Sequence, residues 1–285
     1  MAGVRFEKGR KGMSYFTLKN GERLYYEDTG SGEETVVMLH GWTSSHEVFA
    51  PAVPAVSRKA RCVTYDHRGH GGSRQANGEQ VTMDTLAGDL NELITGLGLR
   101  EVTLLGWSMG AGVVMDYTAV YGCGALRRVV LCDMTPRQIN DADWKLGLYQ
   151  GKYTKEDMER DAGKEFYPLY REFAVGAIPK LGKIPAFLLK KPLKEKLAAC
   201  DEGVLKSLSH SMKEKDFRDC VERISVPVHY FYAVPGSLFS PGLADWYAKH
   251  VRTPYHAVAF QDSTHMLISD HPDRFAQEVI RVLES

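Results

Sequence analysis

The chain has 285 residues, 44% hydrophobic and 25% charged, which is typical of a globular protein built as one large domain or as a domain with an insertion. Lysine plus arginine and aspartate plus glutamate both number 36, so the formal net charge is zero and no global basic excess indicates a nucleic-acid partner. No apolar run reaches the ~18–20 residues that a membrane span needs, and no signal-peptide core is visible.

The first half of the chain alternates strand and helix patterns. After a basic, Gly-rich start that we expect to be a tail, residues 14–18 and 23–28 predict a hairpin turned at Asn20-Gly21. Four apolar runs then predict buried strands, at 35–39, 61–66, 102–106 and 127–133. Helical patterns cover 46–57, 82–97 and 108–121. This alternation predicts a parallel, doubly wound sheet led by an antiparallel hairpin.

The pattern changes after Pro136. Residues 137–223 are charged and helical in character, and no strand run of comparable quality occurs among them. Strand patterns then return at 226–233 and 255–260, and helical ones at 245–251 and 272–283. We therefore expect a core domain of residues 1–136 and 224–285, with a helical cap, residues 137–223, inserted into it.

The cysteines favour a reducing compartment. There are five, an odd number, and their spacing matches no zinc pattern (Cys62, Cys123, Cys132, Cys200 and Cys220). Free thiols of this kind are typical of cytoplasmic proteins. No metal and no cofactor are predicted.

A serine lies between two glycines where a predicted strand gives way to a helix. The segment Gly106-Trp107-Ser108-Met109-Gly110 fits G-x-S-x-G, in which small residues permit a sharp turn with the serine at its apex. The free N–H groups of the following helix favour negative charge beside it. The pentapeptide alone is common by chance, but the strand before it and the helix after it favour a nucleophile.

Three motifs together resemble the α/β-hydrolase fold: HGW at 40–42, YDHRGHGGS at 65–73 and the GWSMG around Ser108. Their spacing resembles the branch that holds cofactor-free haloperoxidases, perhydrolases and small carboxylesterases, over most of the chain from Tyr15 onward. The resemblance implies an eight-stranded, mostly parallel sheet flanked by helices, with a helical cap inserted after strand 6. It also implies esterase-type chemistry at the serine.

Such a serine needs a base and an oxyanion hole. His265 lies in QDSTHMLISDHPDRF, after the last strand run, where the family places its base. The backbone N–H of Met109 follows the nucleophile, and by similarity the N–H of Trp42 is the second oxyanion donor. The other histidines near motifs are expected to be structural (His40, His67, His70 and His271).

The usual acid of the family is missing. Aligning position 240, in Ser240-Pro241, with the proline that closes the family's G-x-x-D-x-x-x-P segment puts Gly236 where the aspartate should stand, and no carboxylate lies between Tyr230 and Leu243. We expect Asp133, at the end of strand 6, to replace it, because loops at neighbouring strand ends converge on one crevice. A pair of Ser108 and His265 without a carboxylate, or an inactive relative, are the alternatives. Three further carboxylates are weaker candidates (Asp28, Asp66, expected to pair with Arg68, and Asp262).

The expected substrate is a small carboxylic ester in an apolar pocket. Candidate pocket residues surround the serine (Gly41, Trp107, Met134, Leu238 and Phe239). Six apolar residues of the cap are expected to face either this pocket or the cap's own core (Phe166, Tyr167, Tyr170, Phe173, Phe187 and Leu188). The Lys-rich run 190–196 is expected to be a solvated face.

Other activities fit the same residues. A perhydrolase, a C–C bond hydrolase, a hydroxynitrile lyase or a non-catalytic ligand-binding relative are alternatives to an esterase. No nucleic acid is expected as a partner, and the oligomeric state stays open, a homo-oligomer included.

Overall fold

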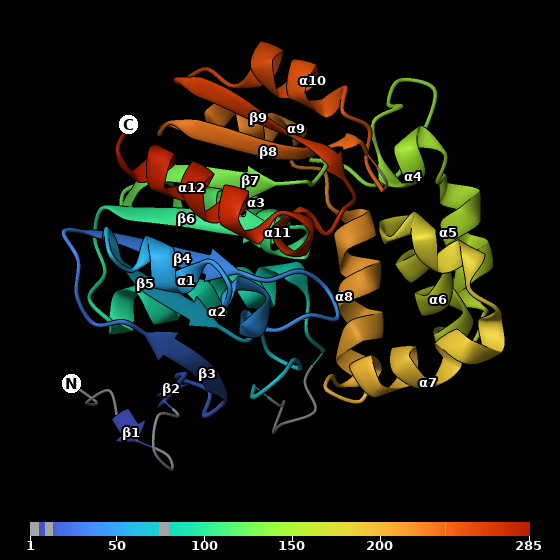
Figure 1. The fold of residues 1–285 in the computed structure, drawn as a ribbon, viewed down its shortest axis with the longest axis horizontal. Coiled ribbons are helices and arrows are strands. Elements are labelled where there is room, and N and C mark those ends of the chain that lie inside the picture. Colours follow the sequence, from blue (N-terminus) through green and yellow to red (C-terminus); the bar gives the residue numbers. More distant parts are fainter. Residues whose placement is uncertain (1–5, 9–13, 74–79, 237) are drawn as a thin grey trace.

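A nine-stranded sheet forms the centre of the molecule in the computed structural model (Figure 1). The structure describes residues 6–8, 14–73, 80–236 and 238–285, and of residues 6–8 the backbone alone. The strand order is β1-β2-β3-β5-β4-β6-β7-β8-β9. The strands are β1 (Phe6–Lys8), β2 (Ser14–Thr17), β3 (Arg23–Asp28), β4 (Glu34–Leu39), β5 (Ala60–Tyr65), β6 (Val102–Trp107), β7 (Leu126–Cys132), β8 (Val228–Pro235) and β9 (Tyr255–Ser263).

The pairing is antiparallel from β1 to β3 and between β3 and β5, and parallel among β4 to β9. Strands β2 to β9 are the eight expected from the sequence, which confirms a mostly parallel sheet with a leading hairpin. The short β1 is a ninth strand at the edge of the sheet, within the start that we expected to be a tail. The rest of that tail, residues 1–5 and 9–13, lies outside the described residues.

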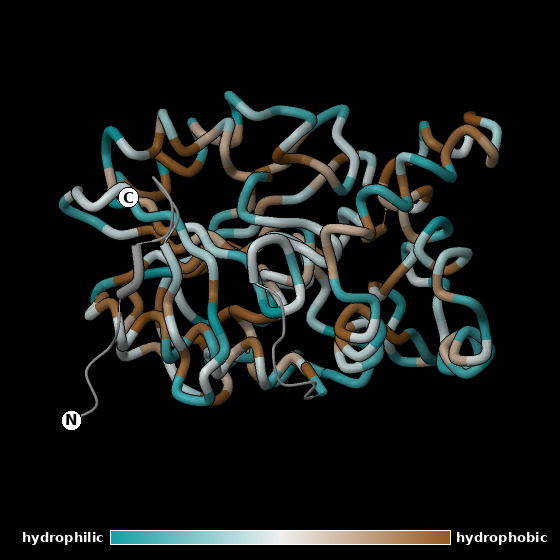
Figure 2. Tube along the Cα trace, turned by 90° about the horizontal axis from the view of Figure 1, so that it is seen from below, coloured by the Kyte–Doolittle hydropathy of each residue, from teal (hydrophilic) through white to brown (hydrophobic). Residues whose placement is uncertain are grey.

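Helices cover both faces of the sheet. Helices α2 (Met83–Gly96), α3 (Met109–Tyr121), α9 (Arg218–Arg223) and α10 (Leu243–His250) contribute to the hydrophobic core on one face. The 3-10 helix η1 (His46–Phe49), α1 (Val53–Val56), α11 (Leu267–Asp270) and α12 (Pro272–Leu283) contribute to the core on the other. Hydrophobic and hydrophilic stretches alternate along the tube in Figure 2, as expected when each helix buries one face.

Local sequence explains where these helices begin and break. The Thr82 side chain accepts a hydrogen bond from the Thr85 backbone N–H, so Thr82 caps α2 as its pattern predicts. The single helix expected over 46–57 is instead the pair η1 and α1, because Pro51 lies between them, whereas Pro54 is in the first turn of α1, where proline is tolerated. On α12 the predicted apolar stripe is buried, from Phe275 to Val279.

The chain between β7 and β8 is helical. Its elements are α4 (Leu148–Gly151), α5 (Lys155–Ala162), α6 (Phe166–Ala177), the 3-10 helix η2 (Pro179–Lys183), α7 (Ala186–Leu197), α8 (Glu202–Glu214) and α9. Helices α4 to α8 lie beyond the carboxyl ends of the parallel strands, on the right of Figure 1, whereas α9 packs beside the sheet against α3 and α10. Among the described residues, no helix combines the length and apolarity needed to cross a bilayer.

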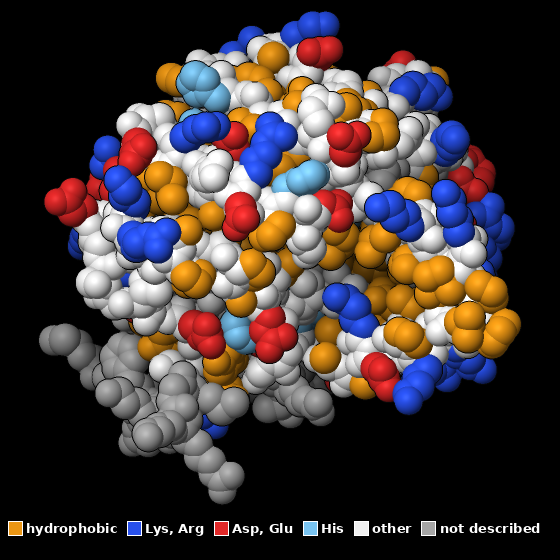
Figure 3. Space-filling model, viewed as in Figure 1, with side chains coloured by type: hydrophobic (Ala, Val, Ile, Leu, Met, Phe, Trp, Pro, Cys, Tyr) orange, Lys and Arg blue, Asp and Glu red, His pale blue; other side chains and the backbone are white. Residues whose placement is uncertain are grey.

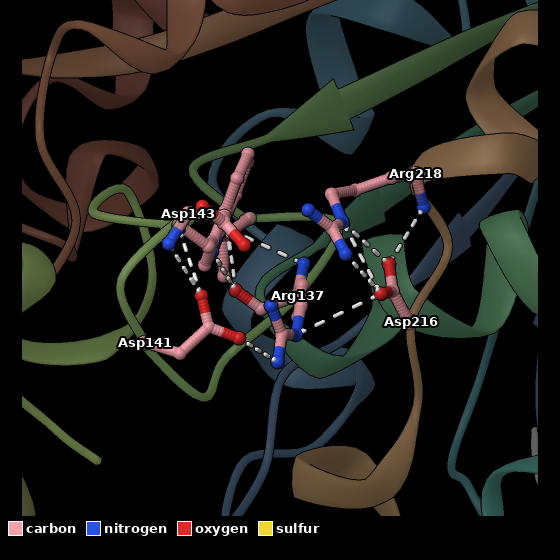
Figure 4. Close-up of polar contacts among 7 residues, drawn as sticks. Arg137, Asp141, Asp143, Asp216 and Arg218 are labelled. Carbon is pink, nitrogen blue, oxygen red and sulfur yellow. Dashed lines mark hydrogen bonds and ion pairs between the residues drawn. The ribbon is translucent and has the colours of Figure 1, made fainter.

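A polar network joins the two ends of this helical segment (Figure 4). The Arg137 guanidinium lies 2.6 Å from the Asp141 carboxylate and 3.7 Å from that of Asp216. Asp216 in turn pairs with Arg218 at 2.7 Å. The backbone also joins the two ends of the helical segment, because the Phe217 N–H donates to the carbonyl of Pro136 at 2.8 Å.

Candidate active site

Ser108 occupies the turn between β6 and α3. Its backbone has φ 55° and ψ −123°, a conformation that residues other than glycine rarely adopt. A Cβ at Gly106 would lie 2.3 Å from the Gly110 carbonyl oxygen, and one at Gly110 would lie 2.2 Å from that of Leu39. Both positions therefore require glycine, and the close packing that this allows holds the serine in its strained turn.

His265 follows β9 and faces the serine. Its Nε2 lies 2.8 Å from the Ser108 Oγ. The Trp107 indole N–H donates to the His265 carbonyl oxygen at 2.9 Å, which ties the histidine loop to the serine turn. The Asp270 carboxylate accepts the Thr264 backbone N–H at 2.8 Å and so closes the same loop from its other side.

Asp133 lies at the end of β7, with both carboxylate oxygens in use. Its Oδ2 lies 2.7 Å from the His265 Nδ1, and its Oδ1 accepts the Ala233 backbone N–H from β8 at 3.3 Å. A carboxylate only accepts hydrogen bonds, so Nδ1 carries the ring proton and Nε2 is left to accept the Ser108 hydroxyl proton. All three side chains are buried. The structure therefore joins Asp133, His265 and Ser108 in one chain of hydrogen bonds.

Gly236, the residue expected at the usual position of the acid, leaves no room for a side chain. Its φ is 88°, in the left-handed region that favours glycine. A Cβ there would lie 2.6 Å from the Phe239 carbonyl oxygen. An aspartate at this position would be both strained and in steric conflict.

The two backbone N–H groups expected to form the oxyanion hole belong to Met109, next to the serine, and to Trp42, next to Gly41. A Cβ on Gly41 would lie 3.0 Å from the Ser108 Cβ, so the 41–42 segment packs directly against the serine. Met109 is the first residue of α3, where the helix offers its N–H no carbonyl partner. No hydrogen bond to a described residue satisfies the N–H of Met109 or of Trp42. Both N–H groups therefore remain candidates for the oxyanion hole.

Three buried histidines support the loop that carries Trp42. The His40 Nδ1–H donates to the Gly41 carbonyl at 2.8 Å, and the His40 Nε2 accepts the His67 backbone N–H at 3.0 Å. The His70 Nε2 accepts the Thr43 backbone N–H at 3.3 Å. All these histidines act as neutral rings, and the structural role expected for them agrees with these contacts.

Burial keeps these rings uncharged. It lowers the pKa of His67 to about 3 and that of His70 to about 4, and it holds the pKa of His40 well below its ordinary value. His70 also lowers the pKa of His40 and of His67, and His67 lowers that of His40, because two positive charges in one buried cluster would repel each other.

The pairing expected between Asp66 and Arg68 is wrong. Arg68 reaches across to α2, where its Nε donates to the Asp89 carboxylate at 3.0 Å. Asp66 instead accepts the ring and backbone N–H groups of His46, at 2.8 and 2.7 Å, and the Gly72 backbone N–H at 2.7 Å. Asp66 thus ties together the loops after β4 and β5, and its contacts are structural.

The remaining candidate acids have other surroundings. Asp28 binds the Arg61 guanidinium with both oxygens, at 2.9 and 2.6 Å. Asp262 is exposed near the end of β9. Across the described ranges, no three His, Cys, Asp or Glu side chains are grouped closely enough to hold a metal ion.

A cavity of about 380 Å³ opens over Ser108. Trp42, Leu238 and Phe239 line it next to the serine, and the Trp42 indole N–H is bound to the Leu205 carbonyl of α8 at 3.0 Å. The helical segment supplies most of the remaining apolar wall (Leu148, Tyr149, Met158, Phe166, Leu169, Phe173 and Met212).

A smaller cavity of about 100 Å³ also touches the serine and His265. Trp107 lines this second cavity, together with Tyr170, Phe173 and residues of η2 and α7. Of the five expected pocket residues, Gly41 and Met134 lie outside both linings.

Sequence reasoning missed how Trp107 and the helical segment act. Trp107 was expected as a pocket residue, but its hydrogen bond to the backbone of His265 could not be foreseen from chain order alone. Among the cap residues, Phe166 and Phe173 do face the main cavity, whereas Phe187 is strongly exposed. In the helical segment the sequence offers only the helical spacing of its apolar residues. That spacing does not predict whether an apolar face packs on the core, lines the cavity or lies exposed.

Several known proteins are similar to this chain. A family model described as alpha/beta hydrolase fold matches residues 34–166. A non-heme chloroperoxidase from Kitasatospora aureofaciens is 38% identical over 125 residues, which cover 44% of this chain and 45% of that relative. The match thus spans less than half the length of that curated protein.

Two further similarities extend along nearly the whole chain. A pimeloyl-[acyl-carrier protein] methyl ester esterase from Nitrosomonas europaea is 27% identical over 256 residues, 88% of this chain and 96% of that protein. The solved structure of an esterase from Exiguobacterium antarcticum superposes with a TM-score of 0.80 at 24% identity, covering 95% of this chain and 99% of that one.

Proposed function

Since the chain has the α/β-hydrolase fold and is related to the non-heme haloperoxidase branch of that superfamily, we propose that it is a serine hydrolase of small carboxylic esters. One observation carries the proposal: the hydrogen bonds that link Asp133 to His265 and His265 to Ser108, at 2.7 and 2.8 Å. An alcohol, an imidazole and a carboxylate in this order are the parts that acyl transfer needs.

The first half of the reaction forms an acyl-enzyme. The Ser108 Oγ attacks the ester carbonyl carbon while its proton passes to the His265 Nε2. The carbonyl oxygen becomes negative and accepts hydrogen bonds from the N–H groups of Trp42 and Met109, each worth about 3 kcal/mol of barrier. When the C–O bond to the alcohol breaks, the imidazolium returns its proton to the leaving oxygen.

The second half of the reaction releases the acid. Water gives a proton to the His265 Nε2 and attacks the acyl carbon, and the serine oxygen leaves with the proton that the ring returns. Asp133 orients the ring through Nδ1 and stabilises its positive charge in both halves, so it is the displaced acid of the triad.

The helical segment, residues 137–223, acts in this proposal as a cap over the serine. Its aromatic and aliphatic residues make most of the cavity wall, which suits a small hydrophobic acyl group and limits water beside the serine. The core domain then comprises residues 1–136 and 224–285. The free cysteines support a reducing, cytoplasmic setting.

A perhydrolase is the second candidate. The relative from Kitasatospora aureofaciens is named a chloroperoxidase, and the same site accommodates its chemistry if hydrogen peroxide takes the place of water. Peroxide then attacks the acyl carbon, and the acyl group leaves as a peracid while Ser108 regains its proton. Peracid formed from acetate or an acetate ester with added peroxide would identify this variant.

The test of the proposal uses p-nitrophenyl acetate, p-nitrophenyl butyrate and a fluorophosphonate probe. We expect turnover and covalent labelling, both lost in Ser108→Ala. Ser209→Ala is the matched control, because Ser209 lines the same cavity but belongs to the helical segment. Labelling that persists in Ser108→Ala would refute the nucleophile, and a folded protein with neither turnover nor labelling would favour a ligand-binding relative.

A further inference from the structure

Two neighbouring side chains on the outside of the helical segment are unusually exposed. Phe187 is 75% exposed and Leu188 is 55% exposed, at the start of α7. Ile184, one turn before them, is also exposed, and residues 182–188 form an unbroken exposed run. An aromatic and two aliphatic side chains held together in water indicate a surface that meets something else.

All but one of the charged side chains near these residues in the sequence are positive. Six exposed lysines lie between residues 179 and 197, with a single acidic residue, Glu195 (Lys180, Lys183, Lys190, Lys191, Lys194 and Lys196). The whole chain has a formal net charge of zero, so this stretch concentrates positive charge that the rest of the protein balances. Glu195 offsets one lysine only, pairing with Lys191 at 3.8 Å.

The apolar and basic groups share one face of α7. Phe187, Lys190, Lys191 and Lys194 follow helical spacing, and they line a shallow groove of about 490 Å³ with Glu195 and Ala198. Figure 3 shows hydrophobic side chains gathered over the outer side of the helical segment, with Lys and Arg side chains around them. We call residues 180–194 of η2 and α7, with this exposed face, the η2–α7 surface.

We propose that the η2–α7 surface docks the protein on an anionic lipid bilayer. Phe187, Leu188 and Ile184 enter the headgroup and acyl boundary, while the lysines pair with the lipid phosphates and carboxylates above it. The mode is peripheral and adds no membrane span. Lysine side chains suit it, because their long stems lie along apolar surface while the ammonium groups stay in water.

The charge pattern favours a bilayer over a second copy of the chain. Two copies meeting through this surface would bring two sets of lysines together and repel each other. An anionic bilayer instead offers negative headgroups to every lysine and an apolar layer to Phe187 at once.

Docking here would also set the site close to the bilayer. On their inner side, η2 and α7 present Leu181 and Leu193 to the small cavity that touches Ser108 and His265. The surface that faces the lipid and the wall that faces the serine are thus two sides of the same elements. This link to catalysis rests on the proposed function, whereas the docking itself does not.

Sedimentation of the full chain with vesicles tests the proposal. We compare phosphatidylcholine vesicles with vesicles that contain about 30 mol% phosphatidylglycerol, at low salt and at about 0.5 M NaCl. We expect binding to the anionic vesicles at low salt, weak binding to the neutral ones, and loss of most binding at high salt. Absence of binding to the anionic vesicles would overturn the proposal, as would equal binding to both kinds.

Paired variants locate the contact. Phe187→Ser with Leu188→Ser should lower partitioning into anionic vesicles by about tenfold or more, because both side chains leave the apolar layer. Val120→Ser with Tyr121→Ser is the matched control, since these residues are also exposed apolar ones, on α3, away from the lysines. Equal loss in both variants, or a concentration-dependent dimer that only the first variant abolishes, would overturn the docking.

The vesicle results can be distinguished from a failure of the proposed function. Thermal melting verifies that each variant is folded, and fluorophosphonate labelling of Ser108 reads the catalytic site independently of the vesicles. If the chain sediments with anionic vesicles but is never labelled, the docking is supported and the hydrolase function is refuted. If it is labelled but does not sediment, the hydrolase function is supported and the docking is refuted.

Discussion

Asp133 and His265 lie 132 residues apart in the chain, yet the Oδ2 of the first is 2.7 Å from the Nδ1 of the second. The contact crosses from the end of β7 to the loop after β9, past β8, whose Ala233 N–H holds the other carboxylate oxygen. In the proposed mechanism the acid thus lies at the end of β7 rather than in the loop after β8, and it still contacts the histidine ring.

Asp133→Asn should lower kcat for p-nitrophenyl butyrate by a factor of about 10⁴, because an amide no longer holds the ring proton on Nδ1 or stabilises its charge. Stopped-flow or endpoint assays of p-nitrophenolate release measure this. Asp262→Asn is the control, since Asp262 is an exposed carboxylate only three positions before the histidine. A parent-like rate in Asp133→Asn would exclude the role assigned to it.

Gly236→Asp should not restore activity to Asp133→Asn. The added side chain meets the Phe239 carbonyl oxygen and must adopt φ 88°, so it should instead cost about 1–3 kcal/mol of unfolding free energy. Urea denaturation and the same ester assay measure both effects. Gly236→Ala separates the backbone cost from the charge, and recovery of turnover in the double variant would contradict this account.

Trp107→Phe should reduce kcat about tenfold with little change in KM, because it removes the indole hydrogen bond that holds the His265 backbone. The rate of fluorophosphonate labelling should fall in parallel. Trp144→Phe is a matched control: its indole N–H donates to the Arg137 carbonyl at 2.8 Å, in the network at the base of the helical segment. Equal losses in the two variants would argue against a positioning role for Trp107.

The free energy of unfolding should fall as the pH drops below 6.5. His67 and His70 have pKa values lowered to about 3 and about 4 in the folded protein, whereas the unfolded chain takes up these protons near pH 6.5. The stabilisation that these two neutral rings give to the folded state is therefore complete above pH 6.5, and it is lost as the pH falls toward 4 and 3. From pH 7 to pH 5, each of the two histidines should lower the free energy of unfolding by about 2 kcal/mol.

Urea denaturation at these two pH values checks that sign. His210→Gln should leave the dependence unchanged, because the His210 ring is more than half exposed. A free energy of unfolding that stays constant between pH 7 and pH 5 would show that the cluster takes up protons in the folded state.

Asp216→Asn should lower the free energy of unfolding by about 1 kcal/mol, since it removes one carboxylate that serves both Arg137 and Arg218. Lys155→Met is the control, because its ion pair with Glu159 is long, at 3.9 Å, and solvent-exposed. The two variants should differ in urea denaturation. Identical midpoints would mean that the network at the base of the helical segment adds nothing to an ordinary surface pair.

Much of the fold could be predicted because buried parallel strands have continuous runs of apolar residues in their sequence. The strand around Val36 and that around Leu104 were placed within one residue of their observed ends. The serine turn was also predictable, since it depends on adjacent residues alone. The short β1 was missed, because three residues at a sheet edge carry too little pattern to stand out from a tail.

The side-chain partners were harder to predict. Arg68 was expected to pair with Asp66 two positions before it, but the fold offers it Asp89 on α2 instead. The exposure of Phe187 was likewise hidden, because an amphipathic helix looks the same whether its apolar face meets protein or something else. Such choices depend on distances between elements, which sequence spacing does not contain.

The chain leaves β7 at Cys132 and enters β8 at Val228, and between these strands the Phe217 backbone N–H donates to the carbonyl of residue 136 at 2.8 Å. The eighty residues between positions 136 and 217 therefore form a detour whose ends adjoin, and α8 binds this detour to the core through the Leu205 carbonyl, which accepts the Trp42 indole N–H. A different insert grafted at this junction would change which molecules enter, provided that it replaces this contact beside the serine.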